Sequence, residues 1–249
     1  MAGVGDIMLS TDALVAGYER DLPIVRGVDF SVRRGELVVV LGPNGAGKST
    51  FVKAIAGLVP IHSGAVMLDG SDVTAVPTHQ KVRHGLAFVP QTENIFATLS
   101  IHDNLLVAAQ ILPKDRRARR VADLYAMFPD LAVKPARRAG ALSGGQRQML
   151  AVARALIVEP SVLILDEPSA GLSPKIVFEV FERLKAINAT GVTIILVEQN
   201  VKAALAIADR AVILVEGQLR HEGKAAGLMD DPLIAELYLG ARPHKDADR

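Results

Sequence analysis

A lysine and a serine close a glycine-rich stretch at residues 42–50, GPNGAGKST. Gly42, Gly47, Lys48 and Ser49 have the spacing of a P-loop, in which backbone N–H groups and the positive end of the following helix surround a phosphate. Lys48 would reach the β- and γ-phosphates, and the Ser49 hydroxyl would hold Mg²⁺. The alternative is an ordinary glycine-rich turn. The predicted nucleotide-binding residues are Gly42, Pro43, Asn44, Gly45, Ala46, Gly47, Lys48, Ser49 and Thr50.

Two adjacent carboxylates end the apolar run VLILDE at 162–167. Ligands collect at the carboxyl ends of buried parallel strands. Asp166 would therefore orient the magnesium held by Ser49, and Glu167 would face the attacking water. Alternatively, the two carboxylates are the solvated end of a strand.

A serine and two glycines open a predicted helix in LSGGQ, residues 142–146. Ser143 can cap this helix, and Gly144 and Gly145 leave room for a phosphate to approach the free N–H groups. The same residues also make an ordinary helix cap, so the physical signal for phosphate is weak.

The elements that must position these residues begin with a strand–turn–helix unit. ELVVVL, residues 36–41, predicts a buried strand before the P-loop, and the apolar spacing of 51–56 predicts a helix after it. Residues 7–34 alternate in polarity, and breaks at Gly17 and Gly27 predict an antiparallel sheet there. Further strands are predicted at 64–70 and 86–90.

The second half of the chain changes from helices to alternating strands and helices. Successive helices are predicted at 101–112, 116–128 and 143–158. The apolar runs 162–167, 193–198 and 211–216 are typical of parallel strands covered on both faces. The helix predicted over 174–188 places Ile176, Val177, Val180, Phe181, Leu184 and Ile187 on one face.

Composition narrows the function classes. The chain has 249 residues, of which 50% are hydrophobic, and its formal net charge is +1. The near-neutral charge gives no reason to expect nucleic acid as a partner. Cysteine is absent, which excludes disulfides and thiolate metal sites. No secretory signal is visible, and no apolar run approaches the roughly 18–20 residues that span a bilayer.

The order of the motifs resembles the ATP-binding cassette (ABC) family. GPNGAGKST, Gln91 after FVP, LSGGQ and VLILDE follow one another as in that family, over about residues 7–240. The resemblance implies an α/β fold: a P-loop NTPase core with a mainly parallel central sheet, an antiparallel β subdomain and an inserted helical subdomain. One domain would cover 1–241, with the core at 1–95 and 159–241, the helical subdomain at about 96–158, and a polar tail at 242–249.

The resemblance also implies a head-to-tail dimer that sandwiches ATP and Mg²⁺ between one subunit's P-loop and the other's LSGGQ. Ser143, Gly144, Gly145 and Gln146 would then serve the partner's nucleotide. Tyr18 would stack on adenine, with plain packing as the alternative. Gln91 would contact magnesium and its water, and the segment TENIF after it would face a membrane subunit. SAGLS, residues 169–173, would contact the other cassette, although Ser173 replaces the Asp found in many relatives.

Gln199 departs from the family, because most of these ATPases carry a histidine that bridges the γ-phosphate and the catalytic carboxylate. A glutamine amide can donate to phosphate and can orient water. We expect Glu167 to be the general base, Gln199 to keep the site competent, and Lys48 to position the phosphates. The alternative is a slow site that relies on a partner subunit with histidine.

Five segments resemble the LivF-type ATPase of branched-chain amino-acid importers: VEQN, GLSP, MFPDL, QRQMLAVARAL and ELYLG. This resemblance implies a second, different cassette, two membrane permease subunits and an extracytoplasmic solute-binding protein, with the chain peripheral at the cytoplasmic face of the inner membrane. A homodimer stays open. VPQTENIF replaces the VPEGR common in that group, so another solute, such as urea or an amide, also stays open.

A basic cluster raises one competing hypothesis, an ABC ATPase that acts on ribosomes or nucleic acid without transport. Such proteins usually carry two cassettes or a long coiled coil, whereas this chain has one P-loop and one LSGGQ. The cluster also lacks aromatic residues for base stacking. We therefore expect transport and no nucleic acid. The cluster consists of Lys114, Arg116, Arg117, Arg119 and Arg120, with Arg137 and Arg138 later.

Overall fold

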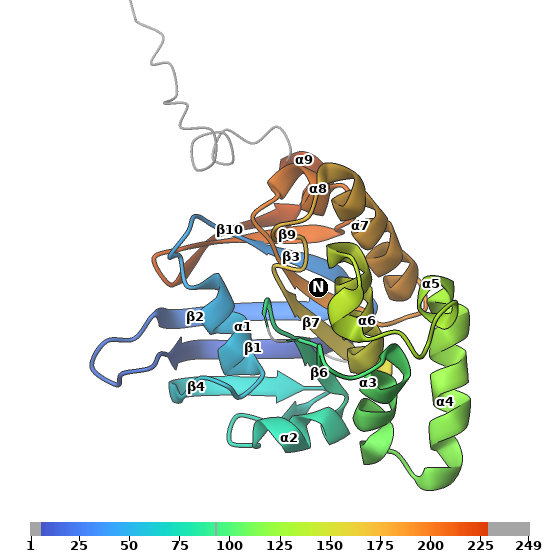
Figure 1. Cartoon of the computed structure of the whole chain (residues 1–249). Helices are drawn as coiled ribbons and strands as arrows, with labels where there is room; N and C mark the ends of the chain where they lie inside the picture. The colour runs from blue at the N-terminus through green and yellow to red at the C-terminus, as the bar shows by residue number, and fades with distance from the viewer. Residues whose placement is uncertain (1–5, 93, 229–249) are drawn as a thin grey trace, which may run out of the picture.

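Two β-sheets and a layer of helices make up the computed structural model, which describes residues 6–92 and 94–228 (Figure 1). One sheet is antiparallel, with strand order β2-β1-β4-β5, and the other has the order β10-β9-β3-β8-β7-β6. The strands are β1 (Ile7–Ala16), β2 (Val25–Arg33), β3 (Leu37–Leu41), β4 (Ile61–Leu68), β5 (Ser71–Asp72), β6 (Leu86–Val89), β7 (Val162–Asp166), β8 (Thr193–Val197), β9 (Arg210–Val215) and β10 (Gln218–Lys224).

The larger sheet is parallel from β9 to β6, and only its edge strand β10 runs antiparallel to its neighbour. Both faces of this sheet are covered. In β3, Leu37, Val39 and Leu41 pack into the cluster that contains the helical layer, whereas Val38 and Val40 pack toward the antiparallel sheet. This burial on both faces explains why β3 is apolar at every position and why polar residues in its neighbours β7, β8 and β9 occur only at strand ends, at Asp166, Thr193 and Arg210. The predicted fold class is confirmed.

Helix α1 (Lys48–Ile55) lies between the two sheets. Its Phe51 ring meets Phe30 of β2 edge to face, with ring centroids 5.5 Å apart. Val52 and Ile55 are fully buried in the same cluster, which also holds Val38 and Val40 of β3. The packing fixes the helix whose first turn follows the P-loop.

The antiparallel sheet differs from its prediction at two glycines. Gly27 does not break a strand, because β2 continues through it with a φ of 69° and a register shift against β1. Gly64 does not bound β4, which starts at Ile61. A Cβ on Gly64 would lie 2.4 Å from the Asp12 carbonyl oxygen, so only glycine allows this close approach.

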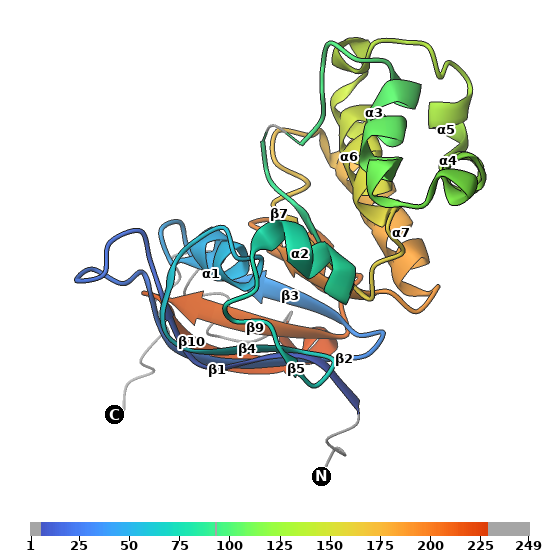
Figure 2. The ribbon, with the colours of Figure 1, turned by 90° about the horizontal axis from the view of Figure 1, so that it is seen from below.

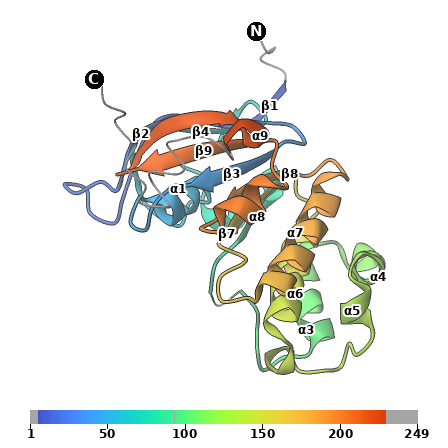
Figure 3. The same cartoon turned by 90° about the horizontal axis from the view of Figure 1, so that it is seen from above.

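The helical layer gathers on the opposite face of the central sheet and extends away from the antiparallel strands (Figures 2 and 3). Its helices confirm the helical character predicted for this part of the chain. In α7, Val177, Val180, Phe181, Leu184 and Ile187 are buried as expected, and Ile176 is half-buried. These helices are α3 (Ile101–Ala108), α4 (Lys114–Met127), α5 (Pro129–Ala132), α6 (Gly144–Leu156) and α7 (Pro174–Asn188).

Several short elements were not predicted from the sequence. They are β5 and β10, α2 (Thr78–Lys81), α8 (Val201–Leu205), α9 (Ala225–Leu228), and the 3₁₀ turns η2 (Val82–His84) and η4 (Ala139–Ala141). The 3₁₀ turn η3 (Ala109–Ile111) forms the end of the helix predicted over 101–112. Within the described ranges, every helix is too short or too polar to cross a membrane. Glu93 of TENIF, the ELYLG segment and the tail predicted at 242–249 lie outside the described residues.

Candidate functional site

The P-loop runs from the end of β3 into α1, and its backbone requires glycine. A Cβ on Gly42 would lie 2.1 Å from the carbonyl oxygen of Leu214. Gly47, which precedes the first residue of α1, has a φ of 95°. No other residue type fits these two positions without moving the neighbouring strand or straining the turn. Glycine at position 47 thus allows the turn of the loop, and the contact between Gly42 and Leu214 of β9 positions the start of the loop against the sheet.

Lys48 lies across the loop with its ammonium group 2.8 Å from the Gly42 carbonyl oxygen and 3.1 Å from that of Pro43. The residue is 5% exposed. Burial lowers the pKa of Lys48, and the carboxylates of Glu167, Asp166 and Glu198 act against that shift. The ammonium group is thus placed in the loop where the phosphates of a nucleotide would sit, and a phosphate would replace its two carbonyl partners.

Ser49 and Asp166 meet as predicted for a magnesium site. The Ser49 hydroxyl donates to Asp166 Oδ1 at 2.8 Å. Asp166 Oδ2 is buried without a hydrogen-bond partner and lies 3.9 Å from the Lys53 ammonium group. Burial raises the pKa of Asp166, and the hydrogen bond from Ser49 opposes the rise. A hydroxyl and a carboxylate with an unsatisfied oxygen are hard ligands of the kind that Mg²⁺ prefers, so these residues fit the ion.

Glu167 is held between two glutamines. Gln91 donates from Nε2 to Oε2 at 2.9 Å, and Gln199 donates from Nε2 to both carboxylate oxygens at 2.8 Å. Each residue follows the carboxyl end of one of the adjacent parallel strands β6, β7 and β8. Glu167 has a φ of 49°, which is uncommon for a non-glycine residue and points to a constrained position. The geometry brings together three of the predicted site residues.

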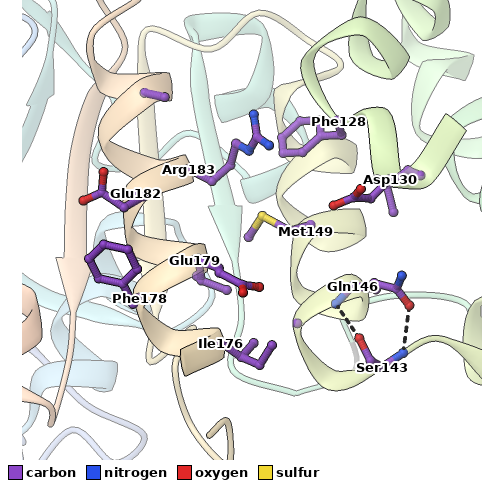
Figure 4. Close-up of a pocket in the computed structure, with 14 residues that line it drawn as sticks. Phe128, Asp130, Ser143, Gln146, Met149, Ile176, Phe178, Glu179, Glu182 and Arg183 are labelled. Carbon is purple, nitrogen blue, oxygen red and sulfur yellow. Dashed lines mark hydrogen bonds between the residues drawn. The ribbon is translucent and has the colours of Figure 1, made fainter. Parts of the chain in front are cut away.

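The LSGGQ segment lies elsewhere, at the start of α6 in the helical layer. Ser143 Oγ accepts from the Gln146 backbone at 3.3 Å, and the Gln146 side chain accepts from the Ser143 backbone at 3.2 Å, which makes a capping box (Figure 4). Ser143 is exposed. Ser143, Gly145 and Gln146 line a cavity of about 600 Å³ whose lining includes no P-loop residue. The segment therefore presents its polar start to the outside and makes no described hydrogen bond to the P-loop of the same chain.

The two glycines of LSGGQ also pack closely against neighbouring side chains. A Cβ on Gly144 would lie 2.7 Å from Leu172 Cδ2, and one on Gly145 would lie 2.5 Å from Ile176 Cγ2. A side chain at 145 would therefore collide with the β-branched Ile176 in the first turn of α7, whereas one at 144 would require the end of the Leu172 side chain to move. Sequence reasoning considered only helix capping and phosphate approach for this pair.

Tyr18 lies in the turn between β1 and β2 and is 62% exposed. The same turn leads to Ile24, whose Cγ2 would lie 3.2 Å from a Cβ on Gly47 of the P-loop. Figure 2 shows this turn projecting beside α1. The ring of Tyr18 is therefore open to solvent on the P-loop side of the molecule, as stacking on a base would require.

Sequence reasoning missed one buried carboxylate beside the site. Glu198 follows β8 and is 1% exposed. It accepts hydrogen bonds from Ser169 and from the backbone of Gln199. In the sequence, Glu198 and Asp166 each follow directly after a run of apolar residues. This pattern does not say which of two neighbouring polar residues is buried.

The basic cluster around α4 has partners within the chain. Arg116 pairs with Glu159 at 2.7 Å, Arg117 donates to the Leu112 carbonyl oxygen at 2.9 Å, and Arg120 donates to the Ile157 carbonyl oxygen at 3.1 Å. These bonds tie α4 to the ends of η3 and α6. They favour a structural role for these three arginines.

Comparison with known proteins places the chain among transport ATPases. Residues 25–170 match the ABC transporter family. The chain is 44% identical to the probable branched-chain amino acid transport ATP-binding protein LivF of Archaeoglobus fulgidus, over 94% of this chain and 99% of that protein. It is 34% identical to the lipopolysaccharide export system ATP-binding protein LptB of Escherichia coli K12, over 87% and 91%.

Solved structures of the same kind superpose over almost the whole chain. A nucleotide-free ATP-binding cassette from an ABC transporter matches with a TM-score of 0.85 and 25% identity, covering 94% of this chain and 100% of that one. The ADP conformation of the cassette MJ1267 matches with a TM-score of 0.83 and 26% identity, covering 94% and 99%. The β-sheets and helical layer described above are thus those of a cassette that binds nucleotide.

Proposed function

Since this chain belongs to the ABC transporter family and is one of its ATP-hydrolysing subunits, we propose that it powers an importer of branched-chain or related amino acids. The observation that carries this substrate class is the 44% identity to LivF along 99% of that protein. In this proposal the chain sits peripherally at the cytoplasmic face of the membrane. It is one domain with its core at 1–95 and 159–241 and a helical subdomain at about 96–158.

ATP binds at the P-loop, where Lys48 exchanges the carbonyl oxygens of Gly42 and Pro43 for phosphate oxygens. Tyr18 stacks on the adenine ring. Ser49 and Asp166 would hold Mg²⁺, with Gln91 at its water, and the bound ion would supply positive charge beside the phosphates. The support for this assignment is the contact between Ser49 and Asp166 and the unsatisfied Asp166 Oδ2.

Glu167 acts as the general base for the attacking water. Its carboxylate accepts from Gln91 and Gln199, and these bonds hold it at the carboxyl edge of the sheet while leaving lone-pair capacity for a water. Gln199 can then donate to the γ-phosphate while its oxygen accepts from the water, since an amide has both functions. The water lies between the base and the phosphorus, and positioning supplies most of the rate enhancement.

A second cassette completes the site in this proposal. Ser143, Gly144, Gly145 and Gln146 contact the γ-phosphate of the ATP bound by the partner, and SAGLS lies at the dimer contact. The exposed capping box, turned away from its own P-loop, supports this arrangement. Among the solved relatives, the cassette MJ0796 is described as a dimer bound to ADP and Pi, and its likeness to this chain, at 23% identity, shows the fold alone.

A membrane subunit docks beside the segment that follows Gln91. A groove of about 240 Å³ lies there between β6 and α6. Arg154 of α6 stacks over Phe96 and donates to the Asn94 carbonyl oxygen, and Asn94 Nδ2 donates to Gln148 Oε1 at 3.2 Å. These bonds connect the segment after Gln91 to the helical layer, so displacement of Gln91 by nucleotide is transmitted to the groove.

A second candidate function has support from the comparisons. LptB proteins of Acidithiobacillus ferridurans and Escherichia coli match the chain at 35% and 34% identity, and their names assign them to lipopolysaccharide export. Their identity is lower than that of LivF, so we favour import. A third possibility, action on ribosomes or nucleic acid, would require tight, salt-sensitive RNA or DNA binding in a filter assay.

The test is reconstitution of the full chain in proteoliposomes with the membrane subunits and binding protein encoded beside its gene. We expect ATP hydrolysis to be stimulated by the binding protein loaded with leucine, isoleucine or valine, and to be lost in Lys48→Ala. Stimulation by an amide or by urea would keep the importer class and replace the solute. Neighbouring subunits that bind lipopolysaccharide instead would contradict import.

A further inference from the structure

Glu198 is a carboxylate with almost no contact with solvent, directly beside the proposed hydrolysis site. Its Oε1 accepts from the Ser169 backbone N–H at 3.0 Å, and its Oε2 accepts from the Ser169 hydroxyl at 2.7 Å. Oε2 also accepts from the Gln199 N–H at 3.2 Å, and the Asn200 N–H is a further donor. Burying a carboxylate is costly unless its oxygens are satisfied, and here both are.

These hydrogen bonds join two segments that lie far apart in the sequence. On one side is Gln199, whose side chain holds both oxygens of Glu167. On the other side is Ser169, the first residue of SAGLS. An apolar side chain could fill the same space without the cost of burying a charge. Unlike an apolar side chain, the carboxylate makes hydrogen bonds to both segments and so fixes their positions relative to each other.

The connection continues from Ser169 to the start of α6. The Ser169 carbonyl oxygen accepts from the Leu172 N–H at 3.1 Å, which closes a turn. Leu172 then fills the space that a side chain on Gly144 would occupy, with its Cδ2 2.7 Å from that Cβ position. A shift of Ser169 would thus move both the SAGLS segment and the packing under LSGGQ.

We propose that Glu198 is a positioning residue for ATP hydrolysis, which holds the Gln199 backbone and the SAGLS segment in one fixed arrangement around Glu167. It touches neither nucleotide nor water and acts through Gln199 and Ser169. The proposal rests on the roles assigned above to Glu167 and Gln199. It also gives SAGLS, the segment expected at the other cassette, a direct link to the hydrolysis site of its own chain.

The first test compares Glu198→Gln, Ser169→Ala and Ser169→Thr in the reconstituted complex. Glu198→Gln replaces one carboxylate oxygen by an NH₂ group, which cannot accept the hydrogen bonds that Ser169 and Gln199 donate. Ser169→Ala removes the hydroxyl that donates to Glu198. We expect kcat to fall about 10- to 100-fold in both, with KM for ATP changed less than about twofold, because misplacement affects chemistry more than binding. Ser169→Thr keeps the hydroxyl and should retain kcat.

The matched control is Glu36→Gln, the same chemical change in a partly buried carboxylate that pairs with Arg210 near the start of β3. It should leave kcat unchanged. The double variant Glu198→Gln/Ser169→Ala should be no slower than the slower single variant, since both remove one link. The proposal is overturned if the two effects multiply in the double variant, or if kcat is unchanged in the single variants. It is also overturned if Glu36→Gln loses as much kcat as Glu198→Gln.

The second test does not depend on activity. Hydrogen exchange of the full chain should be about tenfold faster in peptides covering 167–173 and 198–201 of Glu198→Gln, and unchanged there in Glu36→Gln. Unchanged exchange in Glu198→Gln means that Glu198 does not hold the two segments together. Faster exchange combined with full activity of Gln199→Ala means that Glu198 does hold them and that the catalytic assignment of Gln199 is wrong. The two failures are therefore distinguishable.

Discussion

At the scale of single residues, the chemistry converges on Glu167 and its two amide partners. A histidine in place of Gln199 could carry a positive charge beside the carboxylate, whereas the amide holds it by hydrogen bonds alone. The hydrogen bonds from Gln91 and Gln199 keep the carboxylate in position.

We expect Gln199→Ala to lower kcat by about 10- to 100-fold, since it removes a group that positions the attacking water. Gln199→His should retain most activity, because the ring can donate to phosphate. Steady-state ATP hydrolysis by the complex measures both, with Gln80→Ala on the exposed helix α2 as the control. Wild-type kcat in Gln199→Ala would make this residue a spectator and favour a site that relies on its partner.

Asp166 should make magnesium binding sensitive to pH. Its pKa is raised by burial, so a proton competes with Mg²⁺ at a higher pH than for an ordinary aspartate, and affinity should fall as pH drops through this raised pKa. The folded state binds the extra proton, so the charged carboxylate lowers stability at neutral pH and the penalty disappears as pH falls through the raised pKa.

Asp166→Asn tests both consequences. The melting temperature without magnesium should rise by on the order of 2 °C, because the amide removes a buried charge and keeps an oxygen for the Ser49 hydroxyl. Manganese binding to the ATP complex, followed by electron paramagnetic resonance, should weaken and lose the pH dependence that protonation of Asp166 causes. A lower melting temperature or an unchanged metal affinity would contradict the assignment.

At the scale of elements, the start of α6 has two requirements at once. It must expose N–H groups and a serine for a partner's phosphate, and it must lie close against SAGLS and α7. Glycine at positions 144 and 145 serves both, because the space above each Cα is already filled by Leu172 and Ile176. Loss of activity in a glycine variant therefore does not by itself prove a phosphate contact.

Gly145→Ala should lower the melting temperature, because overpacking against Ile176 costs about 1–3 kcal/mol and helix propensity returns only about 1 kcal/mol. Adding Ile176→Ala removes the collision and should restore the melting temperature. If ATP hydrolysis stays low in that double variant, the glycine also serves the phosphate. Gly227→Ala in α9, where a Cβ would meet nothing within 4 Å, is the control. An unchanged melting temperature in Gly145→Ala alone would contradict the packing role.

At the scale of the whole molecule, the chain offers two half-sites on different parts of its surface. The P-loop with Asp166, Glu167 and Gln199 lies at the carboxyl edge of the central sheet, and LSGGQ opens a helix of the other layer (Figures 2 and 3). The described hydrogen bonds of Lys48 and Ser49 go to the loop itself and to Asp166, and those of Ser143 and Gln146 stay within the capping box. A head-to-tail dimer would bring each half to its complement twice, by symmetry.

Mixing two inactive variants tests this pairing. The test addresses the homodimer, which stays open beside a pair of different cassettes. Lys48→Ala loses the P-loop half and Ser143→Arg loses the LSGGQ half, so a homodimer of either variant should be inactive. A mixed dimer keeps one intact site, and random pairing should restore about a quarter of the wild-type rate. The rate of the mixture, compared with each variant alone, is the measurement. If the mixture stays inactive while the wild-type chain hydrolyses ATP alone, both halves act within one subunit.

The sequence by itself determined the P-loop, the apolar strands and the order of motifs that reveals the family. Each depends on short-range rules: glycines allow the loop, and burial of parallel strands on both faces favours apolar residues. Asp166 lies beside Ser49, and its role as a magnesium ligand stays a prediction.

Only the tertiary structure decided what surrounds that unit. Gln91, Glu167 and Gln199 meet because β6, β7 and β8 are neighbours, and strand order is not encoded by any local pattern. The burial of Glu198 and the packing of Ile176 over Gly145 likewise depend on segments that are distant along the chain. Local residue types fix which conformations a segment can adopt, whereas the contacts between segments are fixed only when the whole core is packed.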